Sequence, residues 1–210
     1  MFNLEEQEQV DAIKAWWKQH GNSVIMALTV FVAVLASIQG WRYYQNSQAQ
    51  QAAVLYDVLQ NAAQSGDTQK IRNAAGQIIE KFARTPYAAR SALVSARANY
   101  EAGDIKSAKA QLQWVIDNGK EDAIKDVARL RLAGVMLDEK NMVGALKLLE
   151  SKHSESYDAI YADFKGDVLT AQDKTDEARK SYAVALEKTD IKSPFRKYIQ
   201  IKQDSLGEAK

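Results

Sequence analysis

One uninterrupted apolar stretch, from about Asn22 to Trp41, constrains this chain more than any other feature of its 210 residues. No charged residue lies between Lys18 and Arg42. As an α-helix, this uncharged segment is roughly 34 Å long at about 1.5 Å per residue, against about 30 Å for the hydrocarbon core of a bilayer. We therefore predict a transmembrane helix over residues 22–42.

The side chains of this segment favour insertion into a membrane. The strongly apolar ones, which form the predicted membrane anchor, are Val24, Ile25, Leu28, Val30, Phe31, Val32, Val34, Leu35 and Ile38. Such residues contribute roughly −0.3 to −0.6 kcal/mol each, a sum on the order of −3 to −5 kcal/mol. Aromatic residues bracket the segment, as expected of rings at the two membrane interfaces. These predicted interface aromatics are Trp16, Trp17, Trp41, Tyr43 and Tyr44.

Two other interpretations of the apolar stretch are a buried core helix and a cleaved signal peptide. Buried helices of soluble proteins seldom lack a charge for this long. The small residues of Val34-Leu35-Ala36 resemble a cleavage site, but the preceding region is long and acidic for a signal peptide. Apolar character also continues beyond that point to Trp41. We predict that the helix is retained as an anchor.

Basic residues near the two ends of the span predict its orientation. Lys14 and Lys18 precede it, whereas Arg42 alone follows it within the next twenty or so residues. This small bias places the N-terminus in the cytoplasm, because basic residues concentrate on the cytoplasmic side. Residues 1–21 are then a short cytoplasmic segment, and residues 43–210 form a domain across the membrane.

Composition limits what this domain is. About 165 residues remain beyond the span, enough for one domain with a core. The net charge of +1 gives no reason to expect a nucleic-acid partner. Cysteine is absent, which excludes disulfides, thiolate metal sites and a cysteine nucleophile. With 2 Pro and 10 Gly, the composition favours an all-α fold.

Small residues recur along the domain at a helical-repeat period. Ala96, Ala133 and Gly166 are 37 and 33 residues apart, and three further alanines repeat the same spacings: Ala108, Ala145 and Ala178. The tetratricopeptide (TPR) repeat has a period of 34 residues, with small residues where its two helices approach closely. We predict a TPR-like α-solenoid, with repeats at about 50–86, 89–122, 126–156 and 159–190.

The first and last elements of this solenoid depart from the consensus. The turn of the first repeat, around Ser65-Gly66-Asp67, is about three residues longer than the consensus turn. At the far end, Ser193-Pro194 is typical of a helix start. We predict a capping helix over residues 193–206 that covers the last repeat.

The sequence offers no chemistry of its own. Neither histidine, His20 or His153, belongs to a catalytic or metal-binding pattern, and we assign both to structural surface roles. The carboxylates fall on predicted helix surfaces and turns. Phosphate-loop, metal-ligand and nucleophile-elbow motifs are absent. We predict no enzymatic activity, no cofactor and no metal.

Partner binding is therefore the expected role. In TPR stacks the first helix of each pair lines a concave face, on which the alignment places Leu93, Arg97, Tyr100, Leu130, Leu137, Asp163 and Asp167. The four apolar or aromatic members form a strip suited to an extended or helical peptide. The alternative, given equal weight, is that Leu130 and Leu137 pack against neighbouring repeats.

The whole layout resembles a known family. The likeness extends over nearly the full chain. It is carried by an acidic N-terminal tail with Trp16-Trp17, a span closed by Gly40-Trp41-Arg42-Tyr43-Tyr44, and the segments Ala110-Gln111-Leu112-Gln113 and Ala162-Asp163-Phe164-Lys165-Gly166-Asp167. The chain is similar to the YfgM family, ancillary subunits of the bacterial SecYEG translocon. The resemblance implies a single-pass type II protein of the bacterial inner membrane with a periplasmic TPR domain.

The resemblance also implies partners: the SecYEG translocon, the membrane-anchored periplasmic chaperone PpiD, and other periplasmic chaperones or exported clients. It implies a scaffold that assists the handover of exported proteins. Two alternatives remain open at this point. One is a TPR assembly factor for another envelope complex, such as a pilus or outer-membrane machinery, and the other is a self-associating structural membrane protein.

Overall fold

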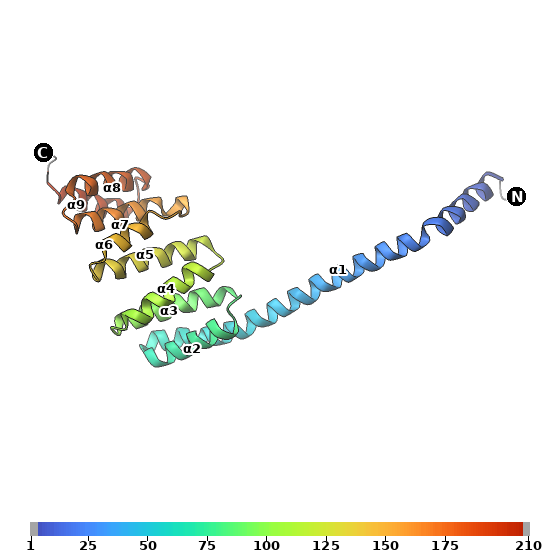
Figure 1. Ribbon diagram of the computed structural model, residues 1–210, viewed down its shortest axis with the longest axis horizontal. Helices are drawn as coiled ribbons and strands as arrows, with labels where there is room; N and C mark the ends of the chain where they lie inside the picture. Colours follow the sequence, from blue (N-terminus) through green and yellow to red (C-terminus); the bar gives the residue numbers. More distant parts are fainter. Residues whose placement is uncertain (1–3, 208–210) are drawn as a thin grey trace. The chain divides into compact units, whose positions relative to one another are not determined.

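The computed structural model describes residues 4–207, in which helices are joined by turns and loops and no β-strand occurs. In chain order the elements are α1 (Leu4–Ser65), α2 (Thr68–Lys81), α3 (Pro86–Glu101), α4 (Ile105–Asn118), α5 (Asp122–Asp138), α6 (Met142–Leu149), the 3-10 turn η1 (Glu155–Tyr157), α7 (Asp158–Thr170), α8 (Thr175–Lys188) and α9 (Pro194–Asp204) (Figure 1). The predicted all-α class is confirmed. The predicted segments 1–21 and 43–210 include residues 1–3 and 208–210, which lie outside the described residues.

The chain divides into two compact units, Met1–Gln50 and Gln51–Lys210. The described part of the first unit belongs entirely to α1. The most apolar 18-residue window of this helix has a mean hydropathy of 2.1, so the helix is long and apolar enough to cross a membrane. The hydroxyls of Thr29 and Ser37 each donate a 2.8 Å hydrogen bond to the backbone carbonyl four residues earlier. These two polar side chains thus have the internal partners that a hydrocarbon environment requires.

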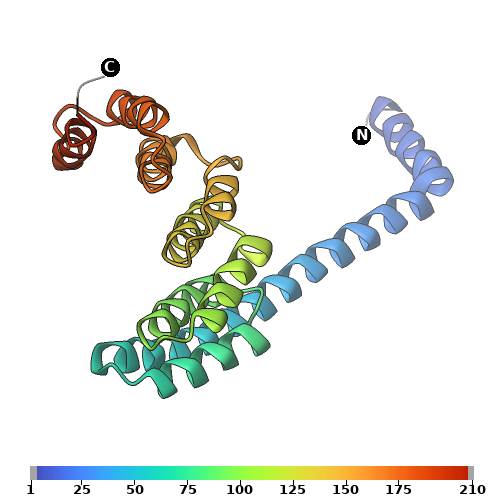
Figure 2. The same cartoon turned by 60° about the vertical axis from the view of Figure 1, so that its left-hand side comes forward.

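The second unit is a stack of helix pairs. The last part of α1 (51–65) shares a hydrophobic cluster with α2, and the pairs α3 with α4, α5 with α6, and α7 with α8 follow. Each helix from α2 to α9 packs against the next one along the chain, as both views show (Figures 1 and 2). The first helices α3, α5 and α7 also contact one another in that order, α3 with α5 and α5 with α7. Local contacts of this kind are typical of a solenoid.

The turn inside each helix pair is the same structure repeated. A residue with a φ between 60° and 80° precedes the second helix of each pair: Gly66, Gly103, Lys140 and Asp173. The next residue then donates its N–H to the carbonyl five residues earlier, at 2.8–3.0 Å. Glycine suits the first two turns because it adopts positive φ without steric cost. Repeating the same turn gives successive pairs similar geometry, which lets them stack.

Side-chain caps begin the second helices of the first three pairs. The side chains of Asp67, Asp104 and Asn141 accept hydrogen bonds from the N–H three residues later, at 3.0, 3.1 and 3.0 Å respectively. Such a cap satisfies one of the free N–H groups at a helix start and contributes about 1 kcal/mol. The fourth pair has Lys174 at this position, without a side-chain cap. The first three pairs therefore combine the positive-φ turn with a side-chain cap, whereas the fourth pair has the turn alone.

The recurring small residues lie where helices approach each other. Ala133, Ala108, Ala145 and Ala178 are fully buried, and Ala96 is 2% exposed. Gly166 shows why the position is restricted, because a Cβ placed there would lie 2.6 Å from Cδ1 and 2.8 Å from Cζ of Tyr182. Contacts this short force a neighbour to move. The spacing seen in the sequence is thus a spacing of close helix contacts.

Helix α9 covers the end of the stack. Pro194 occupies its first turn, and the Oγ of Ser193 accepts a hydrogen bond from the N–H of Phe195 at 3.3 Å. Ile199 is fully buried and joins the last hydrophobic cluster with Leu169 and Leu186. A solenoid needs such a terminal helix because its last repeat otherwise exposes an apolar face.

Candidate partner-binding site

The first unit exposes an extended apolar surface. Eight of the nine predicted anchor residues are 44–60% exposed: Ile25, Leu28, Val30, Phe31, Val32, Val34, Leu35 and Ile38. Val24 is partly buried. The five predicted interface aromatics are also exposed, from 51% for Trp17 to 79% for Tyr43. Monomeric soluble proteins rarely expose a continuous apolar surface of this extent, whereas lipid covers one readily.

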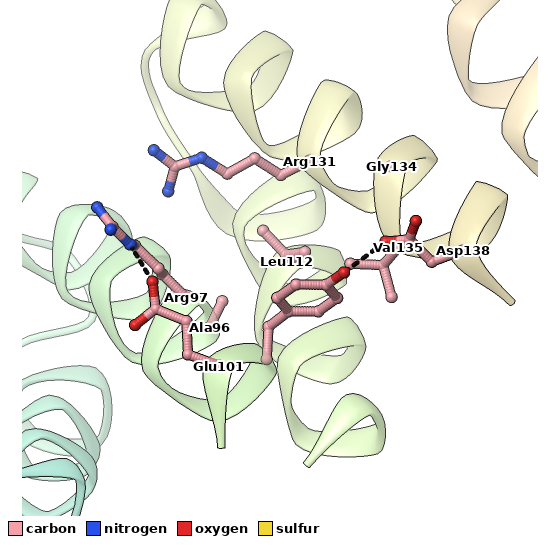
Figure 3. A pocket seen from close by; sticks show the side chains of 9 residues that line it. Ala96, Arg97, Glu101, Leu112, Arg131, Gly134, Val135 and Asp138 are labelled. Atoms are coloured by element: carbon pink, nitrogen blue, oxygen red, sulfur yellow. Dashed lines mark hydrogen bonds and ion pairs between the residues drawn. The ribbon is translucent and has the colours of Figure 1, made fainter. Parts of the chain in front are cut away.

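The second unit contains a pocket of about 470 Å³ between α3 and α5 (Figure 3). Its floor is apolar and consists of Ala96 from α3, Leu112 from α4 and Val135 from α5, all buried. Gly134 completes the α5 wall. A volume of this size falls within the range of about 300–1,000 Å³ typical of ligand pockets.

The rim of this pocket is polar and already partly paired. On α3, the Nε of Arg97 donates a 2.7 Å hydrogen bond to the carboxylate of Glu101. Across the pocket, the hydroxyl of Tyr100 donates to the carboxylate of Asp138 on α5. The hydrogen bond to Asp138, followed by the negative charge of this carboxylate, raises the pKa of Tyr100. The Tyr100–Asp138 contact joins two first helices and fixes one end of the pocket.

Arg131 occupies the other part of the rim. Its Nη1 donates a 3.4 Å hydrogen bond to the backbone carbonyl of Leu93, and Figure 3 shows its guanidinium on the same side of the pocket as that of Arg97. Partial burial, followed by the positive charge of Arg97, lowers the pKa of Arg131. No carboxylate in residues 4–207 lies within salt-bridge distance of it. Among the residues that the structure describes, this arginine therefore has no carboxylate that neutralises its charge.

The predicted concave residues do not all meet in one place. Arg97 and Tyr100 line the pocket, whereas Leu93 is buried in the core beneath α3 and α5. Leu130 and Leu137 are partly buried and pack against a cluster that includes Tyr161 and Val168 of α7. The apolar strip is thus divided between two successive helix interfaces, because equivalent positions on α3 and α5 each face the next first helix.

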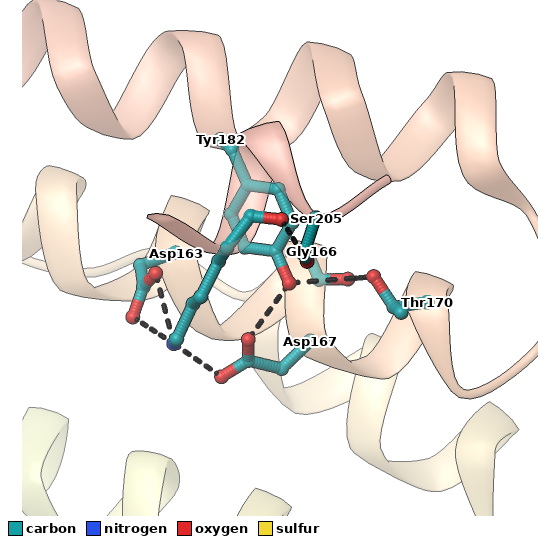
Figure 4. Close-up of polar contacts among 7 residues, drawn as sticks. Asp163, Gly166, Asp167, Thr170, Tyr182 and Ser205 are labelled. Atoms are coloured by element: carbon teal, nitrogen blue, oxygen red, sulfur yellow. Dashed lines mark hydrogen bonds and ion pairs between the residues drawn. The ribbon is translucent and has the colours of Figure 1, made fainter. Parts of the chain in front are cut away.

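The two predicted aspartates of α7 are engaged with the terminal helix (Figure 4). The Nζ of Lys202 donates to both carboxylate oxygens of Asp163, at 3.0 and 2.8 Å, and to Asp167 at 2.8 Å. The hydroxyl of Tyr182 donates to the other oxygen of Asp167 at 2.8 Å. These side chains serve to hold α9 on the stack.

Three charged residues of the pocket, Glu101, Arg131 and Asp138, are not among the partner-binding residues predicted from the sequence. One signal was available on α5, where Arg131, Gly134, Val135 and Asp138 recur at spacings of three and four and so share a helix face. Which face of α5 points to α3 depends on how the helices stack. This information is not local to the segment.

The histidines have structural partners. His153 stacks on Tyr161, with ring centroids 3.9 Å apart, and its Nε2 lies 3.3 Å from the carboxylate of Asp158. His20 stacks on Trp16, with ring centroids 5.2 Å apart. Within residues 4–207, no group of three His, Cys, Asp or Glu side chains is arranged to hold a metal ion.

Fold and site together define a class: a membrane-associated, TPR-like helical protein that presents a pocket between its first helices. A family profile described as a tetratricopeptide repeat-like domain matches residues 14–208. An ancillary SecYEG translocon subunit of Neisseria gonorrhoeae is 32% identical over 208 residues, which cover 97% of this chain and 98% of that protein. A protein of the same name from Haemophilus influenzae is 29% identical over 88% of this chain and 90% of its own length. Another, from Escherichia coli, is 28% identical over 96% of this chain and 97% of its own length.

The chain belongs to the family of ancillary SecYEG translocon subunits, the family that its sequence resembles.

Proposed function

We propose that this protein is a non-enzymatic scaffold of the Sec export machinery, anchored by α1 and assisting the handover of exported proteins. Near-full-length similarity to ancillary SecYEG translocon subunits is the observation that carries the proposal. Its partners are the SecYEG translocon, the periplasmic chaperone PpiD, and other periplasmic chaperones or exported clients. The TPR-like domain supports this role, because such folds bind polypeptides on the surface of their first helices.

The mechanism we propose is local concentration. Anchoring the domain restricts it to the membrane surface, so a weak contact with a channel or chaperone becomes effectively intramolecular. Neither a tight site nor a chemical step is needed for such a role. The open pocket between α3 and α5, with its apolar floor and polar rim, is suited to contacts of this kind.

Photo-crosslinking in native membranes tests the partner assignment. A photoreactive phenylalanine derivative replaces Tyr100 at the pocket, and the same residue replaces Val143, which is 78% exposed on the second helix α6. We expect channel subunits or periplasmic chaperones to be captured from position 100 and not from position 143. Capture of cytoplasmic proteins alone at position 100 contradicts the proposal.

We also propose a type II orientation in the inner membrane, with residues 43–210 in the periplasm. Because the chain contains no cysteine, single cysteines report topology without background. A cysteine at Val143 should react with a membrane-impermeant maleimide in intact spheroplasts, and one at Gln7 only after lysis. The reverse pattern contradicts this orientation.

A further inference from the structure

We propose that the pocket between α3 and α5 binds an acidic side chain of a partner polypeptide, which Arg131 recognises, while a neighbouring aliphatic side chain covers the apolar floor. The proposal deepens the proposed function and rests on it in one respect, that the occupant is a polypeptide. It names the chemistry of the segment that this pocket selects.

The charges of the rim carry the argument. Glu101 is paired with Arg97 at 2.7 Å, and Asp138 accepts the hydroxyl of Tyr100. Arg131 alone among the charged rim residues has no carboxylate or hydroxyl partner in the described part of the chain. A guanidinium has five N–H donors, and the carbonyl of Leu93 accepts from a single one, at 3.4 Å. Arg131 therefore retains the donors needed to hold a carboxylate through two hydrogen bonds.

Positive and negative groups also lie at different ends of the pocket. The guanidinium of Arg131 and the ion pair of Arg97 with Glu101 lie on one side, and the carboxylate of Asp138 lies on the other (Figure 3). An acidic group of the partner is attracted to the arginine side and repelled from the Asp138 side. This polarity selects both the sign of the charge and its position along the pocket.

The floor accounts for the second part of the motif. Ala96, Leu112 and Val135 present small or aliphatic surface beneath the charged rim. Covering this surface with an aliphatic side chain removes apolar area from water and shields the carboxylate–guanidinium contact from solvent. A lone inorganic anion gains only the contact with the guanidinium and leaves the apolar floor uncovered. The arrangement therefore favours a polypeptide with adjacent acidic and aliphatic residues.

A matched pair of peptide libraries tests this inference on the full-length protein in phosphatidylcholine nanodiscs. Both libraries consist of short capped peptides with random uncharged flanks. One has Glu-Leu fixed at its centre and the other has Gln-Leu. We expect the protein to retain the Glu-Leu library about tenfold more strongly, the gain typical of a charge-assisted hydrogen bond pair.

Three variants assign the effect to its residue. Arg131→Gln should abolish the preference for glutamate, and Arg131→Lys should keep part of it. Lys125→Gln removes the same charge from α5 outside the pocket and should leave the preference unchanged. Circular dichroism should show equal helicity for all three variants, because neither Arg131 nor Lys125 belongs to a hydrophobic cluster of the core. A preference that survives Arg131→Gln, or equal retention of the two libraries, overturns the inference.

Competition and crosslinking separate the remaining possibilities. If millimolar inorganic phosphate displaces the Glu-Leu peptides completely, the pocket is a simple anion site and the inference fails. If position 100 captures translocon partners but the protein shows no preference for glutamate, the inferred recognition of an acidic residue is wrong and the proposed function stands. A glutamate preference without capture of any Sec component refutes the proposed function and leaves the peptide site standing.

Discussion

Lys202 on α9 lies 2.8 Å from a carboxylate oxygen of Asp163 on α7, although 39 residues separate them. The same ammonium group lies 2.8 Å from Asp167, so one cation is shared between two carboxylates (Figure 4). Asp163 is buried, whereas the Lys202 side chain is 35% exposed. The contact closes the end of the stack, where α9 also buries Ile199.

Removing the Lys202 charge should loosen this end. Lys202→Met leaves Asp163 and Asp167 facing each other without a cation, and we expect a loss of about 1–3 kcal/mol in the free energy of unfolding, reduced by solvent screening at the exposed lysine. Urea denaturation followed by circular dichroism measures the loss. Lys197→Met on the same helix is the control and should change little. A Lys202→Met variant as stable as the native protein would show that the contact contributes nothing.

Tyr161 should make the stability of the domain depend on alkaline pH. Burial, followed by the charge of Asp126, raises the pKa of Tyr161 to about 12, from 10.0 for a free tyrosine. The folded state thus holds this proton more tightly, so the stability due to Tyr161 is complete below pH 10 and is lost as the pH rises toward 12. Tyr161→Phe should remove part of this pH dependence.

Phenolate absorbance provides the direct measurement. In an alkaline titration, Tyr161→Phe should eliminate a late-titrating tyrosine. If the phenolate signal lost in Tyr161→Phe titrates near pH 10, the environment of this hydroxyl is not the one that the structure describes.

The repeat architecture was predictable from sequence because it depends on local spacing. Close helix approach requires a small residue at one position per repeat, and Ala96, Ala133 and Gly166 record that requirement directly. The turns were readable for a similar reason, since Gly66 and Gly103 are placed by backbone conformation. These features are decided within one helix pair, so they leave a periodic trace in the chain.

The pocket was only half predictable because it depends on which flank of a helix meets its neighbour. Leu130 and Arg131 are adjacent in sequence but about 100° apart around α5, so one faces α7 and the other α3. Asp163 was predicted on the concave face, and its cation comes from a helix 39 residues away. Stacking angles and long-range ion pairs are set by the assembled core.

Two mid-helix glycines should respond in opposite ways to the same substitution. Gly166→Ala places a Cβ within 2.8 Å of Cζ of Tyr182, so we expect a loss of about 1–3 kcal/mol from overpacking. Gly134→Ala meets Phe164 at an ordinary 3.5 Å and gains helix propensity, so we expect a gain of about 0.5–1 kcal/mol. Thermal and urea denaturation of both variants test the pair, and equal effects would contradict the packing described here.

Asp126 should be one of the least replaceable residues of the domain. Its side chain is 1% exposed and accepts hydrogen bonds from Arg129 at 2.7 Å and from the N–H and hydroxyl of Ser154 at 3.0 and 2.7 Å. Asp126→Ala leaves a guanidinium and a backbone N–H without their partner, and we expect a loss of about 3–5 kcal/mol. Urea denaturation measures it. A loss below about 1 kcal/mol would mean that solvent replaces these bonds at little cost.

Two buried serines on α3 should differ in how much their hydroxyls contribute to stability, because only one of these hydroxyls has a hydrogen-bond partner within residues 4–207. Ser91 and Ser95 are both fully buried, but the Oγ of Ser95 accepts a 2.8 Å hydrogen bond from Gln111, whereas that of Ser91 has no partner among the described residues. Ser95→Ala should therefore cost about 0.5–1.5 kcal/mol. Ser91→Ala removes only an unsatisfied polar group and should leave stability unchanged or slightly higher. Because both substitutions delete the same atom from the same helix, a larger loss at Ser91 than at Ser95 would show that the Ser91 hydroxyl has a partner in solution.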